Sequence, residues 1–117
     1  MRRFSLMALL KDDPEIIRQY EEYHAHVWPE VLEGSYRCGM RRTLIYRHGR
    51  QLFMLMETVD DFDMQRDIPK YTENNPKAVE WNSMMTGFME PLPGEPEGST
   101  WVEMKELLAW DGEKWKS

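Results

Sequence analysis

Near the start of the chain every second residue is apolar and alternates with Ser5 and Met7, which is typical of a strand with one buried face. The apolar positions of this pattern are Phe4, Leu6, Ala8 and Leu10. The sequence Asp12-Asp13-Pro14-Glu15 follows, and it predicts the start of a helix. Aspartate caps helices, proline fits the first helical position, and acidic residues favour the first turn.

This first helix has an apolar stripe at Ile16, Ile17 and Tyr20. Because Trp28 precedes Pro29, its backbone is biased away from the helical region, and we expect a kink or break there. Pro29 then opens a second helical stretch, from Glu30 to Arg37, that stops near Gly39.

A hairpin is predicted next. Two sets of residues alternate along a second strand, namely Arg42, Leu44 and Tyr46 with Arg41, Thr43 and Ile45. His48-Gly49 supplies a tight turn, and residues 52–57 form a third strand with Met54 and Met56 on one face.

The second half predicts two more helices and one strand. Asp60-Asp61 caps a helical region to about Asp67, and Asn74-Asn75-Pro76 precedes a helix over residues 77–89. The apolar positions of that helix are Val79, Trp81, Met84, Met85 and Phe88. Residues 91–98 form a loop, and the last strand is marked by Trp101, Val102, Met104 and Leu107. We expect one domain, residues 1–110, and a frayed tail, residues 111–117.

The predicted order is β-α-β-β-α-β, which suits a ferredoxin-like α+β fold with one antiparallel sheet and helices on one face. Nothing in 117 residues is left to cover the other face. We therefore expect a homodimer in which two sheets close a dimeric α/β barrel.

Composition narrows the class of partner. The net charge is −6 and the pI about 5.1, so the chain lacks the basic surface that nucleic acid or anionic membranes require. The single cysteine, Cys38, cannot form an internal disulfide, and no apolar run approaches the ~20 residues needed to cross a bilayer. These features predict a cytoplasmic protein.

The stretch YEEYHAHVWPE, residues 20–30, is rich in rings with polar tips. Tyr20, His24 and Trp28 recur at every fourth position, which on a helix places them along one face. Such rings stack on apolar surfaces while offering polar atoms, and they suit a polar small molecule such as a sugar. The alternative is that all three are amphipathic core residues.

Other chemistries find little support. His24 and His26 would point roughly 200° apart on a helix, and no metal-binding or phosphate-binding motif is present, so we expect neither metal nor cofactor. His24 remains as a general acid/base. His26 and His48 are interpreted as surface or structural residues.

The sequence resembles the L-rhamnose mutarotase family over residues 3 to about 108. The specific part is Tyr20-x3-His24-x3-Trp28-Pro29. Gly39, the hairpin IYRHGRQLFMLME and the stretch WNSMMTGFMEP, from Trp81 to Pro91, agree with it. Members of the family are small dimeric α/β-barrel proteins that interconvert the anomers of 6-deoxy-L-hexoses. The resemblance implies that His24 is the proton donor and that Tyr20 contacts the sugar.

Two positions differ from the rhamnose enzymes, which carry a tyrosine where Thr43 stands and a Trp-Trp pair where Trp81-Asn82 stands. The family includes L-fucose mutarotases, and these differences favour L-fucose slightly over L-rhamnose. Trp28 and Trp81 are expected to stack on the sugar. Tyr20, Tyr46 and a bound water are all candidates for the second proton-transfer group. A monooxygenase-like enzyme of the same fold and a ligand-binding protein remain the alternatives.

Overall fold

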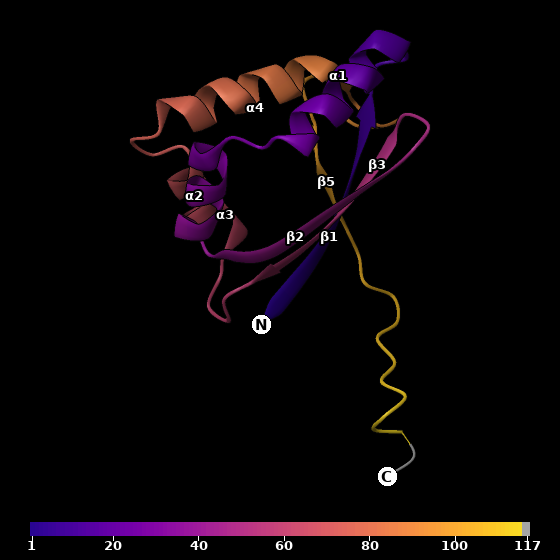
Figure 1. Cartoon of the computed structure of the whole chain (residues 1–117). Coiled ribbons are helices and arrows are strands. Elements are labelled where there is room, and N and C mark those ends of the chain that lie inside the picture. The colour runs from indigo at the N-terminus through magenta and orange to yellow at the C-terminus, as the bar shows by residue number, and fades with distance from the viewer. Residues whose placement is uncertain (116–117) are drawn as a thin grey trace.

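The computed structural model describes residues 1–115 and contains one strongly curved antiparallel sheet with helices along one side (Figure 1). The elements in chain order are β1 (Arg2–Leu10), α1 (Pro14–Ala25), α2 (Pro29–Arg37), β2 (Met40–His48), β3 (Gln51–Thr58), α3 (Met64–Asp67), the 3-10 turn η1 (Ile68–Tyr71), α4 (Pro76–Phe88), β4 (Met89–Glu90) and β5 (Val102–Met104). The predicted α+β class is confirmed. No helix within residues 1–115 is long and apolar enough to cross a membrane.

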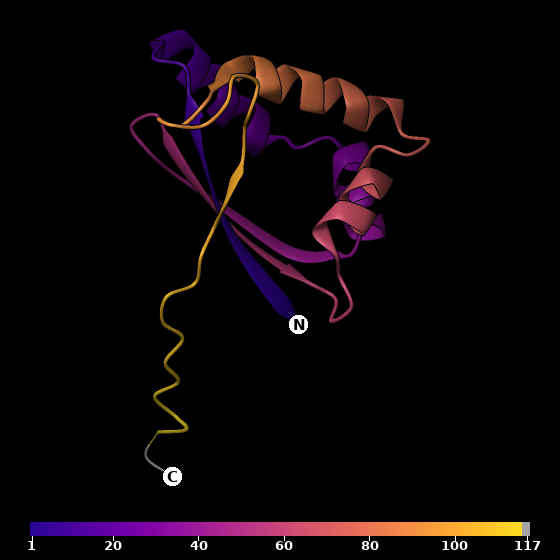
Figure 2. The same cartoon turned by 180° about the vertical axis from the view of Figure 1, so that it is seen from behind.

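Strand β1 is the centre of the sheet. It pairs with β3 along nearly its whole length, and its other edge is shared by β4, at Leu9 and Leu10, and by β5, at residues 5–7. β2 pairs with β3 and is the outermost strand. All of these pairings are antiparallel, so β4 and β5 bring the end of the chain back beside its beginning, as the view from behind also shows (Figure 2).

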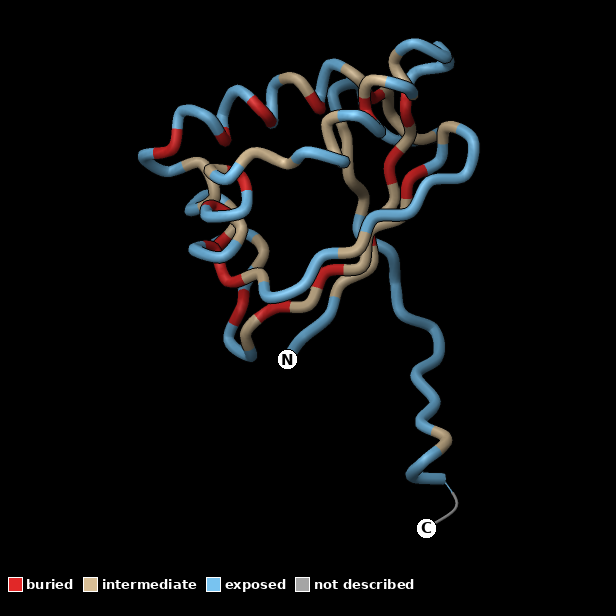
Figure 3. Tube along the Cα trace, in the orientation of Figure 1, coloured by how far each residue is buried: buried red, intermediate tan, exposed pale blue. Residues whose placement is uncertain are grey.

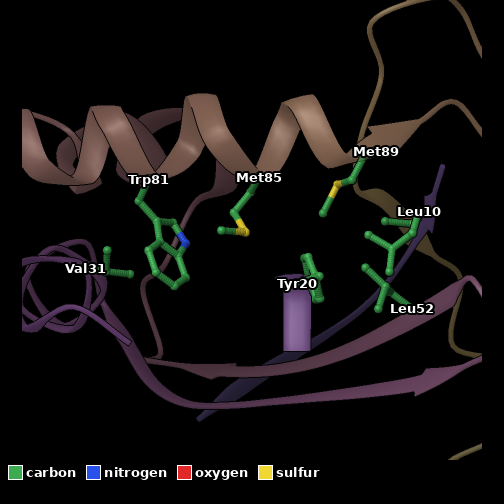
Figure 4. Close-up of a cluster of buried hydrophobic side chains, with 8 residues drawn as sticks. Leu10, Tyr20, Val31, Leu52, Trp81, Met85 and Met89 are labelled. Atoms are coloured by element: carbon green, nitrogen blue, oxygen red, sulfur yellow. The ribbon is translucent and has the colours of Figure 1, made fainter. Parts of the chain in front are cut away.

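The inner face of the sheet is the one that the helices cover, and its residues alternate with those of the outer face. Leu6, Ala8 and Leu10 of β1 are buried on the inner face, together with Leu52 and Met56 of β3. Opposite residues of an antiparallel pair point to the same face. The main hydrophobic core therefore lies between this face and the helices (Figure 4), and it consists of Ala8, Leu10, Tyr20, Val31, Leu52, Trp81, Met85 and Met89.

Helix α1 begins as predicted. The carboxylate of Asp13 accepts a hydrogen bond from the Glu15 backbone N–H at 2.9 Å, and Pro14 occupies the first turn. The helix ends at Ala25 rather than continuing to Trp28, and His26 donates its backbone N–H to the Tyr23 carbonyl. The prediction that Trp28 continues the helical face of Tyr20 and His24 was therefore wrong.

Of the two helices predicted in the second half, α4 begins at the predicted cap and α3 does not. Asn75 caps α4, as its position before Pro76 predicted, by accepting from the Ala78 backbone N–H. The predicted cap Asp60-Asp61 was wrong. Asp63 caps α3 instead, while Asp60 pairs with the N-terminal ammonium at 2.8 Å.

Some predicted core positions lie at the surface. Val79 is 51% exposed because Ala78, Trp81 and Met85 form the buried face of α4. The short strand β4 was not predicted, and β5 ends at Met104, so Leu107 lies outside it. The division into a domain of residues 1–110 and a tail stays a prediction; residues 116 and 117 of that tail lie outside the described part.

Candidate active site

A cleft of about 930 Å³ lies between the inner face of the sheet and the helices. Met54 and Met56 of β3 and Leu6 of β1 contribute apolar lining from the sheet. The polar and aromatic side chains of the lining come from the helices, from β2 and from the segment that leads into β5. They are Tyr20, His24, Ser35, Tyr36, Arg41, Arg42, Thr43, Tyr71, Trp81, Asn82, Thr86, Thr100, Trp101 and Glu103. A pocket with an apolar wall and polar groups around it is typical of a small-molecule site.

His24 lies in the last turn of α1 and is half-buried. Its Nδ1 is 2.8 Å from the backbone carbonyl oxygen of Tyr20. Because a carbonyl only accepts hydrogen bonds, Nδ1 carries the proton, and the neutral ring keeps Nε2 as an acceptor. Burial lowers the pKa of His24 below its ordinary value of 6.5, and the hydrogen bond to Tyr20 offsets part of this effect.

The ring of Tyr20 stacks on the imidazole of His24. It lies one turn before His24 on α1, and the two rings stack with centroids 4.1 Å apart and an angle of 27° between their planes. Tyr20 is only 3% exposed and belongs to the main core, although it also lines the cleft. Burial raises the pKa of its phenol, so Tyr20 stays protonated at neutral pH.

Trp81 of α4 also contacts the imidazole of His24. The two ring centroids are 5.3 Å apart, and the planes are inclined by 64°. Figure 4 shows the Trp81 side chain pointing from α4 towards the sheet. Trp81 is buried and lines the cleft, so His24 is in contact with two aromatic rings, those of Tyr20 and Trp81. Such packing restricts the rotamers of a side chain and fixes where its free ring nitrogen lies.

Trp28 supports this arrangement without lining the cleft. It caps α2 just after α1 ends, and its ring meets Trp81 edge-on at 5.3 Å. Tyr23 contacts both tryptophans edge-on, at 6.5 Å from Trp28 and 5.9 Å from Trp81. The Lys77 ammonium lies 5.4 Å from the centre of the Trp28 ring. Trp28 therefore packs against Trp81 and does not line the cleft itself.

The remaining predicted site residues separate according to the face they occupy. Thr43 pairs with Met56 on the inner face of the sheet and lines the cleft, and Asn82 lines it from α4. Tyr46 pairs with Phe53 on the outer face, and its ring contacts that of Phe53. It is 57% exposed and does not line the cleft. The structure therefore brings together Tyr20, His24, Thr43, Trp81 and Asn82 but not Tyr46.

Glu103 is a site residue that the sequence did not reveal. It lies in β5, and its Cα partner is Leu6 of β1, which is buried on the inner face. Glu103 therefore points to the inner face, and it supplies the one carboxylate in the cleft lining among the described residues. The alternation of the last strand was a possible signal, because Trp101 and Glu103 share one face while Val102 and Met104 share the other.

Two arginines also line the cleft from β2. Arg42 forms an ion pair with Glu57 at 3.5 Å, and Arg41 packs its guanidinium 3.9 Å from the ring centre of Tyr36. Within residues 1–115 no group of three or more histidine, cysteine, aspartate or glutamate side chains is placed to hold a metal ion.

The curved antiparallel sheet with helices on one face defines a protein of the dimeric α/β-barrel fold. Its cleft offers aromatic rings, a histidine and polar groups, which suits the binding of a small molecule. The chain belongs to the L-rhamnose mutarotase family, whose model matches residues 3–109. Among curated proteins, the L-fucose mutarotase of Xanthomonas campestris pv. campestris is 32% identical over 111 residues, which cover 93% of this chain and 88% of that protein. A UPF0734 protein of Dictyostelium discoideum is 40% identical over 98 residues, 81% of this chain and 78% of that one.

Solved structures confirm the fold at low sequence identity. An L-rhamnose mutarotase from Formosa agariphila has a TM-score of 0.67 and 18% identity, covering 95% of this chain and all of that one. Tetracenomycin F2 cyclase from Streptomyces glaucescens, a polyketide cyclase, has a TM-score of 0.59 and 18% identity over 96% and 99% of the two chains. The fold therefore hosts different chemistries, and the side chains of the cleft have to carry the functional argument.

Proposed function

We propose that the protein is a mutarotase that interconverts the α and β anomers of a 6-deoxy-L-hexose, L-rhamnose or L-fucose. The observation that carries this proposal is the state of His24. Its Nδ1–H is bound to the Tyr20 carbonyl, its pKa is lowered by burial, and its ring lines a cleft whose mixed polar and aromatic lining suits a monosaccharide. Membership of the family and the similarity to an L-fucose mutarotase support the same reaction.

The proposed step is a proton transfer between two oxygens bonded to the same carbon. Nε2 of neutral His24 takes the proton from the anomeric hydroxyl. The C1–O1 bond becomes a carbonyl as the bond from C1 to the ring oxygen breaks, and the imidazolium gives its proton to the departing ring oxygen. Rotation about C1–C2 and the reverse sequence then close the ring on the other carbonyl face.

This sequence transfers no electrons and leaves no group on the protein, so it needs no cofactor. Positioned acid/base catalysis of this kind contributes typically 10²–10⁴-fold. Of the earlier candidates for a second proton-transfer group, Tyr46 lies on the outer face of the sheet. Tyr20 lines the cleft, but its raised pKa suits hydrogen bonding rather than loss of a proton.

Binding is proposed to combine one stacking surface with several hydrogen-bonding groups. Trp81 offers its ring to the apolar face of the sugar, while Glu103, Thr43 and Asn82 offer polar atoms to its hydroxyls. Glu103 accepts hydrogen bonds from sugar hydroxyls when it is ionised. Thr43 and Asn82, in place of larger rings, leave a wider and more polar pocket, and on this basis we favour L-fucose over L-rhamnose.

The experiment that tests the function is proton NMR of anomer exchange with purified protein and L-fucose, L-rhamnose and a control hexose that is not deoxygenated. A mutarotase accelerates the exchange between anomeric signals, and a deoxy-sugar enzyme does so most for the first two sugars. A monooxygenase-like enzyme or a simple binding protein leaves exchange at the rate of the buffer, which would reject the proposal.

We also propose that the protein acts as a homodimer and in the cytoplasm. The outer face of the sheet supports the dimer, because no helix within residues 1–115 covers it (Figures 1 and 2). Its apolar residues are Met7, Leu9, Leu44, Tyr46, Phe53, Leu55, Val102 and Met104. The cytoplasm is supported by the single cysteine, Cys38, which is free and buried, because proteins of reducing compartments carry few disulfides.

A further inference from the structure

The start of β2 forms part of the wall of the cleft, next to the end of α2. The strand is exposed along most of its length, as its colouring by burial shows (Figure 3). Its register against β3 shifts between Met40 and Arg42, which lie opposite neighbouring residues of β3, so Arg41 is an extra residue without a partner in that strand. A bulge of this kind re-aims a side chain, and bulges are frequent next to active sites. The side chain of Arg41 lines the cleft.

Two hydrogen bonds and a ring contact hold the guanidinium of Arg41 in place. Nη1 donates to the backbone carbonyl oxygens of Tyr36 and Met40, both at 2.9 Å, and the group lies 3.9 Å from the centre of the Tyr36 ring. The Tyr36 carbonyl belongs to the last turn of α2, so Arg41 also caps this helix. The capping uses Nη1 alone. The opposite edge of the guanidinium, formed by Nε–H and Nη2–H, has the parallel donors that bind a carboxylate or a phosphate in bidentate geometry.

The charge of Arg41 is not neutralised within the described part of the chain. Most arginines pair with a carboxylate there, among them Arg42 with Glu57 at 3.5 Å. Arg2, Arg37 and Arg41 have only carbonyl oxygens as hydrogen-bond acceptors, and Arg41 is the one of these three that lines the cleft. In residues 1–115, Nε and Nη2 of Arg41 have no partner. The cleft therefore contains a fixed positive charge with an unused binding edge.

The cleft has room for a charged group beside a sugar ring. Its volume of about 930 Å³ is near the upper end of the range, about 300–1,000 Å³, of sites that hold drug-sized ligands. Leu32 and Tyr36 of α2 also line it and are 58% and 64% exposed, so it is open to solvent beside Arg41. The hydroxyl of Thr43, on the same strand as Arg41, makes only a 3.9 Å contact with the sulfur of Met40 and remains able to bind a ligand.

We propose that Arg41 is an anion subsite of the cleft, and that the cleft takes, besides 6-deoxy sugars, hexoses that carry a carboxylate or a phosphate at C6. C6 is the carbon of an aldohexopyranose that stands outside the ring, so a charged group on it extends from the ring that stacks on Trp81 towards β2. Nε–H and Nη2–H of Arg41 donate to two oxygens of that group. The subsite itself stands on the geometry of Arg41, whereas its use for charged sugars rests on the proposed mutarotase function.

Inorganic phosphate and acetate test the subsite without any sugar. The probe is the Nε–H signal of Arg41 in proton–nitrogen NMR spectra, assigned by its loss in Arg41→Lys. Either anion should shift this signal saturably, and the effect should weaken as salt is added. Arg37→Gln is the matched control, because Arg37 also donates to a backbone carbonyl, that of Glu73 at 3.1 Å, but does not line the cleft. An Arg41 signal that does not move, or that moves no more than the Arg37 signal of the wild type, would overturn the subsite.

The use of the subsite for sugars is tested with L-galactose, L-galacturonate and L-galactose 6-phosphate, which differ only at C6. At low salt the wild type and Arg37→Gln should bind at least one charged sugar about five- to tenfold more tightly than L-galactose, because a bidentate ion pair is added. The charged sugar that binds more tightly shows which group the subsite suits. Arg41→Gln should lose the preference, and denaturant unfolding checks that this variant is folded. Arg41→Lys, which keeps the charge but not the paired donors, should retain only part of it.

The outcomes separate the subsite from the proposed function. Equal affinities of the wild type for all three sugars, or a preference that survives in folded Arg41→Gln, would overturn the binding of charged sugars at Arg41. Anion binding at Arg41 without acceleration of anomer exchange for any sugar would leave the subsite standing and reject the mutarotase. Acceleration of L-fucose exchange in a protein whose Arg41 signal ignores both anions would support the mutarotase and reject the subsite.

Discussion

The imidazole of His24 lies on the phenol ring of Tyr20, with ring centroids 4.1 Å apart, and its Nδ1 is 2.8 Å from the carbonyl of the same tyrosine. One residue thus fixes both the orientation and the tautomer of the other. The spacing of four residues on α1 makes this possible, because it places His24 one turn after Tyr20 on the same face of the helix, with its side chain tilted back towards that turn.

The rate of anomer exchange should depend on the protonation of His24. Burial lowers the pKa of this histidine below 6.5, and the proposed step needs the neutral ring. The rate is therefore expected to be constant around neutral pH and to fall in acid with a midpoint below 6.5. A pH–rate profile, with an NMR titration of the His24 ring, measures both values. A rate that rises as His24 becomes protonated would contradict the assignment of the neutral ring as the base.

The same shift has a consequence for stability. The unfolded chain binds a proton on this histidine at higher pH than the folded chain does, so His24 opposes folding as the pH falls through 6.5 towards the folded pKa. Replacing His24 with Gln should reduce the loss of stability in this window, as measured by denaturant unfolding at several pH values.

Glu103→Gln should weaken sugar binding. The carboxylate lines the cleft from β5, and losing a hydrogen bond to a charged acceptor typically costs about tenfold to a hundredfold in affinity. The expected result is a higher KM with a smaller change in kcat. Glu80→Gln is the matched control, because Glu80 is exposed on α4 and pairs with Lys77 outside the cleft. Equal KM values for both variants would remove Glu103 from the binding site.

Thr43 and Asn82 should set the preference between the two sugars. A site that hydrogen-bonds a particular hydroxyl discriminates strongly against its epimer, whereas ring stacking discriminates weakly. The double substitution Thr43→Tyr/Asn82→Trp should therefore shift the ratio of exchange rates towards L-rhamnose. If the parent protein already prefers L-rhamnose, or if the ratio does not move, these two positions do not determine the choice of sugar.

Gly34→Ala should destabilise the wall of the cleft that α2 forms. A Cβ at Gly34 would lie 2.5 Å from the Tyr71 backbone oxygen, so either α2 or η1 would have to move. Overpacking of this kind costs about 1–3 kcal/mol. A Cβ at Gly87 on α4 would have no atom within 4 Å outside its chain neighbours and the backbone of its own helix, so Gly87→Ala should be neutral or slightly stabilising. Denaturant unfolding of both variants measures the difference, and equal stabilities would show that α2 shifts freely.

Local signals in the sequence were sufficient for most elements. Asp13-Pro14 and Asn75-Pro76 mark the starts of α1 and α4, and the alternation of the hairpin predicts β2 and β3. The same alternation held information about the site. Thr43 and Tyr46 are three residues apart on one strand, so they must point to opposite faces, and only one of them can line the cleft.

Other features depend on contacts between distant segments. The spacing of Trp28 matched a helical face, but α1 ends at Ala25, and the position of the tryptophan is set by its packing against Trp81. Glu103 enters the cleft only because β5 pairs with β1, with Glu103 opposite Leu6. No local pattern specifies that pairing, because it joins the two ends of the chain.

The most direct test of the central claim is the rate of anomer exchange of L-fucose, measured by saturation transfer between its two anomeric proton signals, for the wild type and for His24→Ala. Circular dichroism should show that the variant is folded, and His26→Ala, which replaces an exposed histidine, serves as the control. We predict that the wild type and His26→Ala accelerate exchange well above the rate in buffer and that His24→Ala loses at least about 100-fold of that acceleration. A wild-type rate equal to that of buffer for both L-fucose and L-rhamnose, or a folded His24→Ala that is as active as the wild type, would contradict the account.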